Sequence, residues 1–356
     1  MTTFVLNGWA AAPSAWDLCR FPRERIFSYL DGADGLAEAA LAAADGAALV
    51  GWSMGGSLAL SLFLAHPDRV RALVLVAATP RMMRDADWPG MTPRRLRALR
   101  IGLELTKGEG FGDAPPGRPN PYLLDTPENL ERGLAFLADV DLRARLASLP
   151  ESVRRLPVAI FQSESDGIVR ASNADFLASV FPCATVARIP GSEHALPVAV
   201  PSEIDAAVAR VVAAAEMRET RAIVSLGSNI EPRRERLADA LAALAALPGT
   251  RLAAASEVRE TEPVDVPAEY AALRFMNQVA VLETTLSARE FSRRMHAIED
   301  AQGRVRTVRN GPRTIDLDLI DFGGIALGDP CLTLPHPRFR ERAFVTEPLA
   351  ELGIAL

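Results

Sequence analysis

Residues 47–66, AALVGWSMGGSLALSLFLAH, decide the fold of the first half of the chain. The apolar run Ala47–Gly51 is typical of a buried strand, and Ser57–His66 is typical of a helix. A glycine-flanked turn joins them and carries Ser53 within a G-x-S-x-G pattern. Any glycine-rich turn can produce this pattern, but the strand–turn–helix context is the one that a nucleophile elbow requires. We therefore expect Ser53 to be a catalytic nucleophile.

Further apolar runs lie on both sides of this unit, at Thr3–Leu6, Arg71–Ala78 and Val158–Gln162. Continuous apolar strands that alternate with helical stretches indicate a parallel α/β sheet with helices on both faces. Between Arg81 and Leu149 the pattern is helical, and we interpret this stretch as an excursion from the sheet. The Ala/Val-rich segment Ile204–Met217 predicts a closing helix.

Partners for Ser53 follow in the order Ser, Asp, His that α/β-hydrolases use. Asp166 comes directly after the Val158–Gln162 run, and His194 lies near the end of this half. An Asp-Gly pair can also be a simple turn, and a loop histidine is often merely exposed. We expect His194 to be the base and Asp166 to orient it. The backbone N–H groups of Trp9 and Met54 are expected to form the oxyanion hole.

This half resembles the α/β-hydrolases, and among them the pimeloyl-carrier-protein methyl ester carboxylesterases. The resemblance rests on GWSMGG at 51–56, HPDRVRALVLVAATP at 66–80, VDLRARL at 140–146 and SDGIV at 165–169. It implies a serine carboxylester hydrolase without a cofactor, acting on an ester that is either free or linked to a carrier protein. Asn7 departs from the pattern, because relatives commonly carry His before the oxyanion glycine.

A change of pattern marks a second domain. The charged segment Glu216–Arg221 precedes a new strand, so we divide the chain into residues 1–217 and 218–356. The second part predicts strands at Ala222–Leu226, Leu252–Val258, Asn277–Glu283 and Thr314–Asp321, with helices at Arg233–Ala246 and Ala288–Ala301. Strands that lie close together in sequence favour an α+β sandwich.

The stretch Gly311–Ile320, GPRTIDLDLI, carries the chemistry of the second part. In a strand, Asp316 and Asp318 share one face, where two carboxylates can hold Mg²⁺ together with substrate phosphates. Four arginines lie nearby with no acid among them, and arginine forks suit bidentate phosphate contacts; these are Arg304, Arg306, Arg309 and Arg313. A half-exposed strand with a structural salt-bridge network is the alternative interpretation.

These residues resemble the signature of 6-hydroxymethyl-7,8-dihydropterin pyrophosphokinases, a ferredoxin-like family of folate biosynthesis. The matching segments are IEDAQGRVR at 298–306, NGPRTIDLDLI at 310–320, GSN at 227–229, RFMNQVAVLET at 274–284 and LPH at 334–336. The resemblance implies that ATP and 6-hydroxymethyl-7,8-dihydropterin are the substrates and that two Mg²⁺ ions are the cofactor.

The resemblance also implies a role for each matching side chain. Asp316 and Asp318 would hold the two metal ions. The other implied groups are catalytic Arg304, Arg306 and Arg313; ATP-binding Glu299, Arg304, Arg313, His336 and Arg342; and pterin-binding Phe275, Asn277 and Phe344.

Composition limits the remaining function classes. A net charge of −6 argues against a general nucleic-acid or membrane binder. The three cysteines are scattered, and no basic residue precedes Arg20, so we expect a cytoplasmic protein without a signal peptide. Two alternatives stay open: a degenerate first half that serves as a scaffold, or a second half that binds nucleotide or pterin without turnover.

Overall fold

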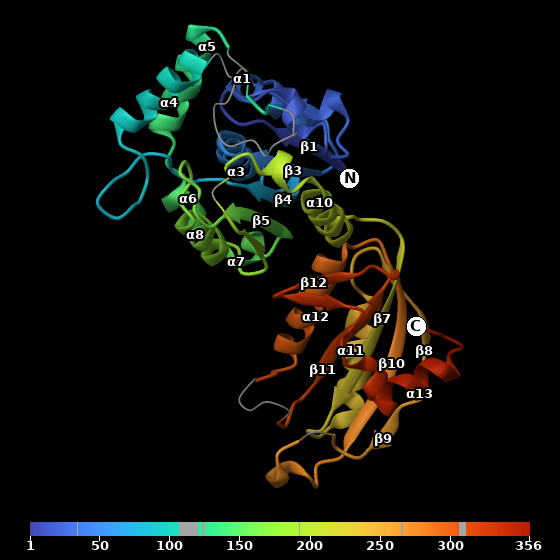
Figure 1. Ribbon diagram of the computed structural model, residues 1–356. Helices are drawn as coiled ribbons and strands as arrows, with labels where there is room; N and C mark the ends of the chain where they lie inside the picture. Colours follow the sequence, from blue (N-terminus) through green and yellow to red (C-terminus); the bar gives the residue numbers. More distant parts are fainter. Residues whose placement is uncertain (34, 107–119, 123–124, 192, 265, 306–310) are drawn as a thin grey trace. The chain divides into compact units, whose positions relative to one another are not determined.

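The computed structural model describes residues 1–33, 35–106, 120–122, 125–191, 193–264, 266–305 and 311–356. The chain forms two compact units, Met1–Val212 and Ala213–Leu356 (Figure 1). The division falls inside a helix, close to the position that the sequence suggests.

Unit 1 contains a six-stranded sheet in the order β2-β1-β3-β4-β5-β6, and every neighbouring pair is parallel. Its central strands are buried along almost their whole length, which explains their continuous apolar sequences. The predicted parallel sheet is confirmed. The strands are β1 (Thr2–Leu6), β2 (Ile26–Phe27), β3 (Ala47–Trp52), β4 (Val70–Val76), β5 (Val158–Ser163) and β6 (Thr185–Ile189).

Helices follow most of these strands, as expected for a crossover topology. Helix α3 (Met54–Ala65) begins directly after β3 and packs on the central strands. The excursion between β4 and β5 contains α4 (Pro93–Thr106) and α5 (Pro127–Asp139), which contact each other. The other helices are α1 (Tyr29–Ala33), α2 (Leu36–Ala43), α6 (Arg143–Ala147), α7 (Glu151–Arg154), α8 (Ser172–Val180), α9 (Leu196–Ala199) and α10 (Pro201–Ala215).

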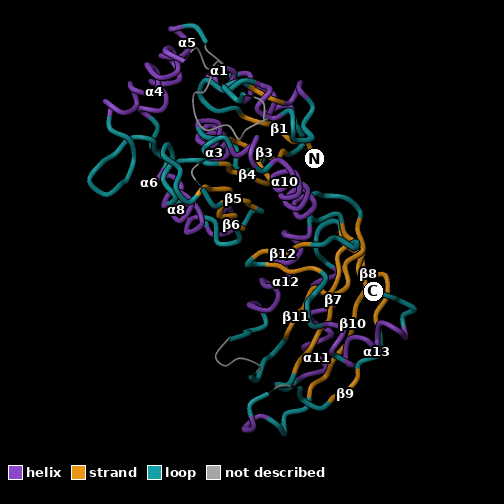
Figure 2. The backbone as a smooth tube through the Cα atoms, in the orientation of Figure 1, coloured by secondary structure: helices purple, strands orange, loops and turns teal. Residues whose placement is uncertain are grey.

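Unit 2 is built on an antiparallel sheet in the order β11-β7-β10-β8, with the short β9 paired to β10 (Figure 2). Together with α11 and α12, the four main strands follow the β-α-β-β-α-β order of a ferredoxin-like fold, which confirms the prediction. The elements are β7 (Thr220–Ser228), α11 (Arg233–Ala245), β8 (Thr250–Ala255), β9 (Arg259–Thr261), β10 (Phe275–Thr284), α12 (Ala288–Ala301), β11 (Asp316–Phe322), β12 (Leu327–Asp329), β13 (Leu332–Leu334) and α13 (Ala343–Glu351).

The two faces of this sheet have different coverings. Leu226 and Leu317 belong to the large core that the sheet forms with α11 and α12. Ile223 and Val279 point to the opposite face, where a smaller cluster includes Val345 of α13. Because strand side chains alternate between faces, Asn277, Asp316 and Asp318 lie on the side of α13. The candidate site of unit 2 is on that side.

Strand β8 ends earlier than the sequence predicts. The apolar run reaches Val258, but the strand ends at Ala255. The hydroxyl of the next residue, Ser256, accepts a hydrogen bond from the backbone N–H of Val279 at 3.1 Å. A side-chain oxygen thus takes the place of a ladder carbonyl, which periodicity in the sequence cannot reveal.

Candidate functional sites

The turn between β3 and α3 holds Ser53 in a strained conformation. Its φ of 55° and ψ of −119° lie outside the regions that non-glycine residues usually adopt. The N–H of Ser53 donates to the carbonyl of Val76 at 2.8 Å, which ties the turn to β4. A Cβ on Gly55 would lie 1.9 Å from the carbonyl oxygen of Leu6, so only glycine allows α3 to begin this close to β1.

Ser53, His194 and Asp166 form one hydrogen-bonded chain. Ser53 Oγ lies 2.9 Å from His194 Nε2, and His194 Nδ1 lies 2.7 Å from Asp166 Oδ2. With Nδ1 protonated, the imidazole donates to the carboxylate and accepts from the hydroxyl, which is the arrangement of a general base. All three residues are at least nine-tenths buried.

The carboxylate of Asp166 is itself held by the backbone. Its Oδ1 atom accepts hydrogen bonds from the N–H groups of Ile168 and Val169, at 2.7 and 3.0 Å. The histidine is anchored from the other side, because Trp52 Nε1 donates to the carbonyl of His194 at 2.8 Å. The Asp-Gly turn seen in the sequence therefore fixes the orientation of this carboxylate.

The expected oxyanion-hole residues flank the serine. Met54 is the first residue of α3, where backbone N–H groups have no acceptor within the helix. Trp9 follows Gly8, and a Cβ on Gly8 would lie 3.4 Å from Cβ of Ser53. The Trp9 turn is tight, since the N–H of Ala11 donates to the carbonyl of Gly8 at 3.2 Å and Ala10 has a φ of 53°.

Asn7 shapes this turn, a role that the sequence did not reveal. Its side chain is fully buried and donates from Nδ2 to the carbonyl of Ala11 at 3.1 Å. Its Oδ1 accepts from Trp16 Nε1 at 2.8 Å. The departure at Asn7 therefore supplies a donor and an acceptor that hold the loop. The signal was the residue itself, because a polar amide directly after a buried strand needs partners.

In unit 2, three neighbouring strands bring the site residues into one row. Asp316 of β11 pairs with Gly227 of β7, and Gly227 pairs with Asn277 of β10. A Cβ on Gly227 would lie 2.8 Å from Oδ1 of Asn277, so the glycine leaves open space between the aspartate and the amide. The next row on this face begins with Asp318, which pairs with Ser225.

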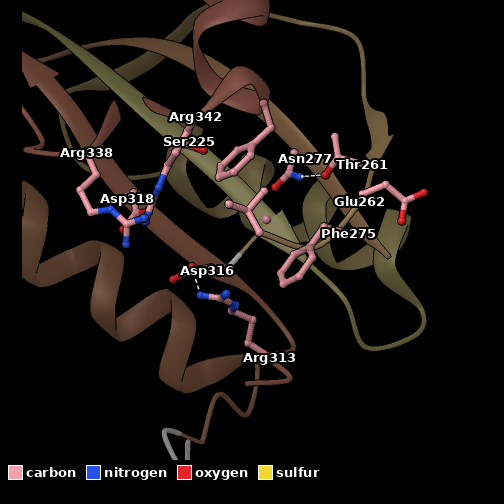
Figure 3. Close-up of a pocket in the computed structure, with 13 residues that line it drawn as sticks. Ser225, Thr261, Glu262, Phe275, Asn277, Arg313, Asp316, Asp318, Arg338 and Arg342 are labelled. Carbon is pink, nitrogen blue, oxygen red and sulfur yellow. Dashed lines mark hydrogen bonds and ion pairs between the residues drawn. The ribbon is translucent and has the colours of Figure 1, made fainter. Parts of the chain in front are cut away.

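A cleft lies over these rows, and Figure 3 shows it. Asp316 and Arg313 lie on one side, and Phe275, Asn277 and Thr261 on the other. The cleft lining also includes five positions that neither the predicted site residues nor the GSN segment cover, among them Thr261, which accepts a hydrogen bond from Asn277 Nδ2 at 2.7 Å. The full lining is Ser225, Gly227, Thr261, Glu262, Val264, Phe275, Asn277, Arg313, Asp316, Asp318, Arg338, Arg342 and Phe344.

Arginines neutralise both aspartates. Arg313 Nη1 lies 2.6 Å from Asp316, which also pairs with Arg304, and Arg342 Nη1 lies 2.8 Å from Asp318. Two of these guanidinium groups also lie over aromatic rings, Arg313 over Phe275 at 5.0 Å and Arg342 over Phe344 at 5.6 Å. Each carboxylate is thus linked through an arginine to a ring that lines the cleft.

Glu299, predicted to bind ATP, is almost fully buried. It is 1% exposed, accepts the backbone N–H of Leu317 at 2.8 Å and pairs with Arg304. Burial works to lower the pKa of Arg304, but Asp316 and Glu299 raise it above its usual value, so the guanidinium stays charged. Glu299 thus binds the backbone of β11 at Leu317, between the two aspartates, and also holds the side chain of Arg304.

The GSN segment at 227–229 attaches the arginine loop to β7. The backbone N–H of Arg313 donates to Oδ1 of Asn229 at 2.7 Å, and Ser228 Oγ donates to the carbonyl of Thr314 at 2.6 Å. These two side chains therefore position Arg313 and the start of β11. Arg306, expected to be catalytic, lies outside the described residues.

His336 is half-buried at the edge of this region. Its N–H donates to the carbonyl of Ile320, and its Nδ1 accepts from the N–H of Arg338 at 3.2 Å. Burial lowers the pKa of the imidazole, and the charge of Asp318 opposes this shift. The balance of these two effects lowers the pKa of His336, which favours the neutral form of the ring.

The two aspartates of the cleft can supply only part of the ligands that a Mg²⁺ ion needs. No group of three or more His, Cys, Asp or Glu side chains suited to a metal occurs in the part of the chain that the structure describes. Asp316 and Asp318 supply oxygen ligands on one face of β11, and both line the cleft. Mg²⁺ usually takes one or two carboxylates and completes its shell with water and phosphate oxygens. The aspartates therefore fit magnesium that arrives with a phosphorylated substrate.

Comparison with known proteins agrees with this geometry. Residues 223–354 match the family 7,8-dihydro-6-hydroxymethylpterin-pyrophosphokinase. A 2-amino-4-hydroxy-6-hydroxymethyldihydropteridine pyrophosphokinase from Pseudomonas aeruginosa is 46% identical over 133 residues, which cover 37% of this chain and 80% of that protein. The chain belongs to this pyrophosphokinase family. The enzyme of the same name from Methylorubrum extorquens is 42% identical, over 38% of this chain and 83% of its own length.

Unit 1 has matches of its own. Residues 43–99 match the α/β hydrolase fold family. An esterase from Exiguobacterium antarcticum superposes with a TM-score of 0.46 and 18% identity, over 59% of this chain and 92% of its own. The family match and the parallel six-stranded sheet show that unit 1 has an α/β hydrolase fold, and it is joined in one chain to a pyrophosphokinase of folate biosynthesis. Among the described helices, none is both long and apolar enough to cross a membrane.

Proposed function

We propose that unit 2 transfers pyrophosphate from ATP to 6-hydroxymethyl-7,8-dihydropterin, with Mg²⁺ held between the phosphates and the two aspartates. The observation that carries the proposal is the row Asp316–Gly227–Asn277, which places a carboxylate and an amide on opposite sides of one cleft. The carboxylate side suits the metal–phosphate end of the reaction. The amide side, with Phe275 and Phe344, suits a flat heterocycle that stacks and hydrogen-bonds.

The reaction needs alignment and charge neutralisation more than covalent participation. The hydroxymethyl oxygen of the pterin attacks the β-phosphorus of ATP, the bond from that phosphorus to the α-phosphate oxygen breaks, and AMP leaves. The hydroxyl proton passes to water. Mg²⁺, when bound, neutralises phosphate charge. Arg313 and Arg342, now paired with the aspartates, are positioned to move to the phosphate oxygens when metal takes their place.

The assay that tests this function is AMP release by the full-length protein with ATP, Mg²⁺ and 6-hydroxymethyl-7,8-dihydropterin. We expect AMP that depends on the pterin, with no ADP. Hydrolysis of ATP to ADP would contradict the proposal. No turnover by protein that is folded and binds pterin would also contradict it, and would favour a binding protein.

We further propose that unit 1 is a serine carboxylester hydrolase. The supporting observation is the buried chain from Ser53 through His194 to Asp166, with distances of 2.9 and 2.7 Å. Ser53 Oγ would attack the ester carbonyl while its proton passes to His194. The alcohol then leaves with that proton, and water hydrolyses the acyl-serine with His194 again as base. The N–H groups of Trp9 and Met54 would stabilise the oxyanion.

A fluorophosphonate probe tests this second function, because it reacts with an activated serine whatever the natural ester is. We expect labelling of the wild-type protein at Ser53 and hydrolysis of p-nitrophenyl esters. If folded wild-type protein is not labelled, unit 1 is a scaffold and only the pyrophosphokinase activity remains.

A further inference from the structure

The indole of Trp9 connects the turn beside Ser53 to a helix of the excursion between β4 and β5. Trp9 Nε1 donates a hydrogen bond to the carbonyl of Leu130 in α5 at 3.0 Å, and the side chain is 7% exposed. The same residue thus has its backbone in the turn next to the serine and its side chain attached to α5.

Helix α5 approaches Trp9 closely because of one glycine. A Cβ on Gly133 would lie 2.4 Å from Cδ1 of Trp9, 3.1 Å from its Nε1 and 3.0 Å from Cε2 of Tyr29. Contacts below 3.0 Å do not occur between real side chains, so any larger residue would push the helix and the indole apart.

The segment before α5 is attached to the same region. The N–H of Ala12 donates to the carbonyl of Pro121 at 2.9 Å, and the hydroxyl of Tyr29 donates to Asp125 at 2.9 Å. Burial and the bond to Asp125 raise the pKa of Tyr29, so this hydroxyl keeps its proton. The first contact joins the segment before α5 to Ala12, and the second joins it to Tyr29, whose ring lies beside Gly133.

The turn has little freedom to absorb a movement of α5. A hydrogen bond between Gly8 and Ala11 closes the turn, and Ala10 has a φ of 53°. The side chain of Asn7 also donates a hydrogen bond to the carbonyl of Ala11. A displacement of the indole therefore moves the backbone N–H of Trp9. An error of about 1 Å in the alignment of catalytic groups can reduce a rate about a hundredfold.

We propose that Trp9 is a positioning residue that couples α5 to the oxyanion hole. The position of α5 then controls the rate of acyl transfer to Ser53 more than it controls substrate binding. This proposal rests on the serine hydrolase function proposed for unit 1, and adds that its rate depends on an excursion helix that supplies none of the three residues Ser53, His194 and Asp166.

The test uses Trp9→Phe in the full-length protein, which keeps an aromatic ring and removes the indole N–H. Trp88→Phe is the matched control, because Trp88 Nε1 also donates to a backbone carbonyl, that of Arg81 at 2.7 Å, outside the Ser53 turn. With p-nitrophenyl butyrate, we expect kcat of Trp9→Phe to fall about ten- to a hundredfold with KM within about threefold. Trp88→Phe should keep kcat within about twofold.

Amide hydrogen exchange provides a readout that does not need turnover. We expect Trp9→Phe to speed exchange in α5, residues 127–139, and Gly133→Ala to speed exchange in residues 7–12. The double variant should be no slower in kcat than the slower single variant, since both changes break the same contact.

The proposal is overturned if Trp9→Phe keeps kcat within twofold of the control, or if Gly133→Ala leaves exchange in residues 7–12 unchanged. If Trp9→Phe does not fold, hydrogen exchange in residues 7–12 of Gly133→Ala decides whether the proposal holds. If the wild-type protein neither reacts with the fluorophosphonate nor hydrolyses esters, the hydrolase function fails. The exchange data then still decide whether α5 and the turn are coupled.

Discussion

The two sites of this chain are prepared in different ways. In unit 1, Ser53, His194 and Asp166 are joined by hydrogen bonds in the order that the reaction uses. In unit 2, Asp316 and Asp318 are instead paired with arginines, and the function that we propose requires these ion pairs to open when metal and phosphate bind. Under the functions that we propose, the first site is already assembled for attack by Ser53, whereas the charged groups of the second site must exchange their partners.

This difference follows from the charge that each reaction handles. Acyl transfer develops one negative charge on one oxygen, and a few fixed N–H groups can stabilise it. Phosphoryl transfer brings several negative charges with the substrate, so a site for this reaction needs arginines for the phosphates and carboxylates for the metal ion. Internal ion pairs hold these groups in place until the substrate arrives.

The largest effect is expected from Ser53→Ala. Removing the nucleophile should lower ester hydrolysis by about 10⁴-fold or more and abolish fluorophosphonate labelling. AMP release should not change, because Ser53 belongs to unit 1 and the residues that line the cleft of the proposed pyrophosphokinase site belong to unit 2. Loss of both activities in folded protein would mean that the two units depend on each other, and the comparison above would fail.

Asp318→Asn should have the next largest effect. The amide keeps the shape of the side chain but loses the charge that attracts metal, and several kcal/mol of transition-state stabilisation correspond to about 10³-fold or more in AMP release. Labelling at Ser53 serves as the internal control and should be that of wild type. AMP release near the wild-type rate would exclude Asp318 as a metal ligand.

Gly55→Ala tests the architecture of the first site. The added Cβ would lie 1.9 Å from a backbone oxygen of β1, which cannot rotate away. We expect a loss of about 3 kcal/mol in the free energy of unfolding of unit 1, together with the ester activity. Thermal unfolding measures it; a transition at the wild-type temperature would show that the elbow tolerates a side chain.

Gly227→Ala is the matched change in the second site, with a smaller effect. Its Cβ would meet the side chain of Asn277 at 2.8 Å, and a side chain can turn away at modest cost. We expect KM for the pterin to rise about tenfold, with the unfolding temperature within a few degrees of wild type. If KM for ATP rises instead of KM for the pterin, the amide side of the cleft does not hold the heterocycle.

Local patterns in the sequence were sufficient to predict much of both units. The order of Ser53, Asp166 and His194, each placed after a strand or near the domain end, predicted residues that the structure brings within hydrogen-bond distance. Alternation in 311–320 predicted that Asp316 and Asp318 share a face, and helix α12 has the bounds that the sequence indicated. These features depend on the period of one element, which a short stretch of sequence contains.

Other features depend on contacts between distant segments. A polar amide after a buried strand indicates that Asn7 needs partners, but the sequence does not say which ones, because Trp16 comes within reach only through packing. Thr261 lines the cleft because β9 pairs with β10. Strand β9 has only three residues, which is too short for a pattern in the sequence to reveal it. Glu299 remains a predicted nucleotide contact, and the structure adds that its buried carboxylate supports Leu317 and Arg304, which the sequence did not indicate.

The sequence by itself determined the two fold classes, the nucleophile turn and the paired aspartates, because hydrophobic period and turn chemistry are local properties. Only the tertiary structure decided which arginine pairs with which aspartate, how the strand register places Gly227 between Asp316 and Asn277, and how α5 reaches Trp9. These relations are set by register, close approach and burial between segments that lie far apart along the chain. No local pattern encodes them, because each depends on where a second segment packs.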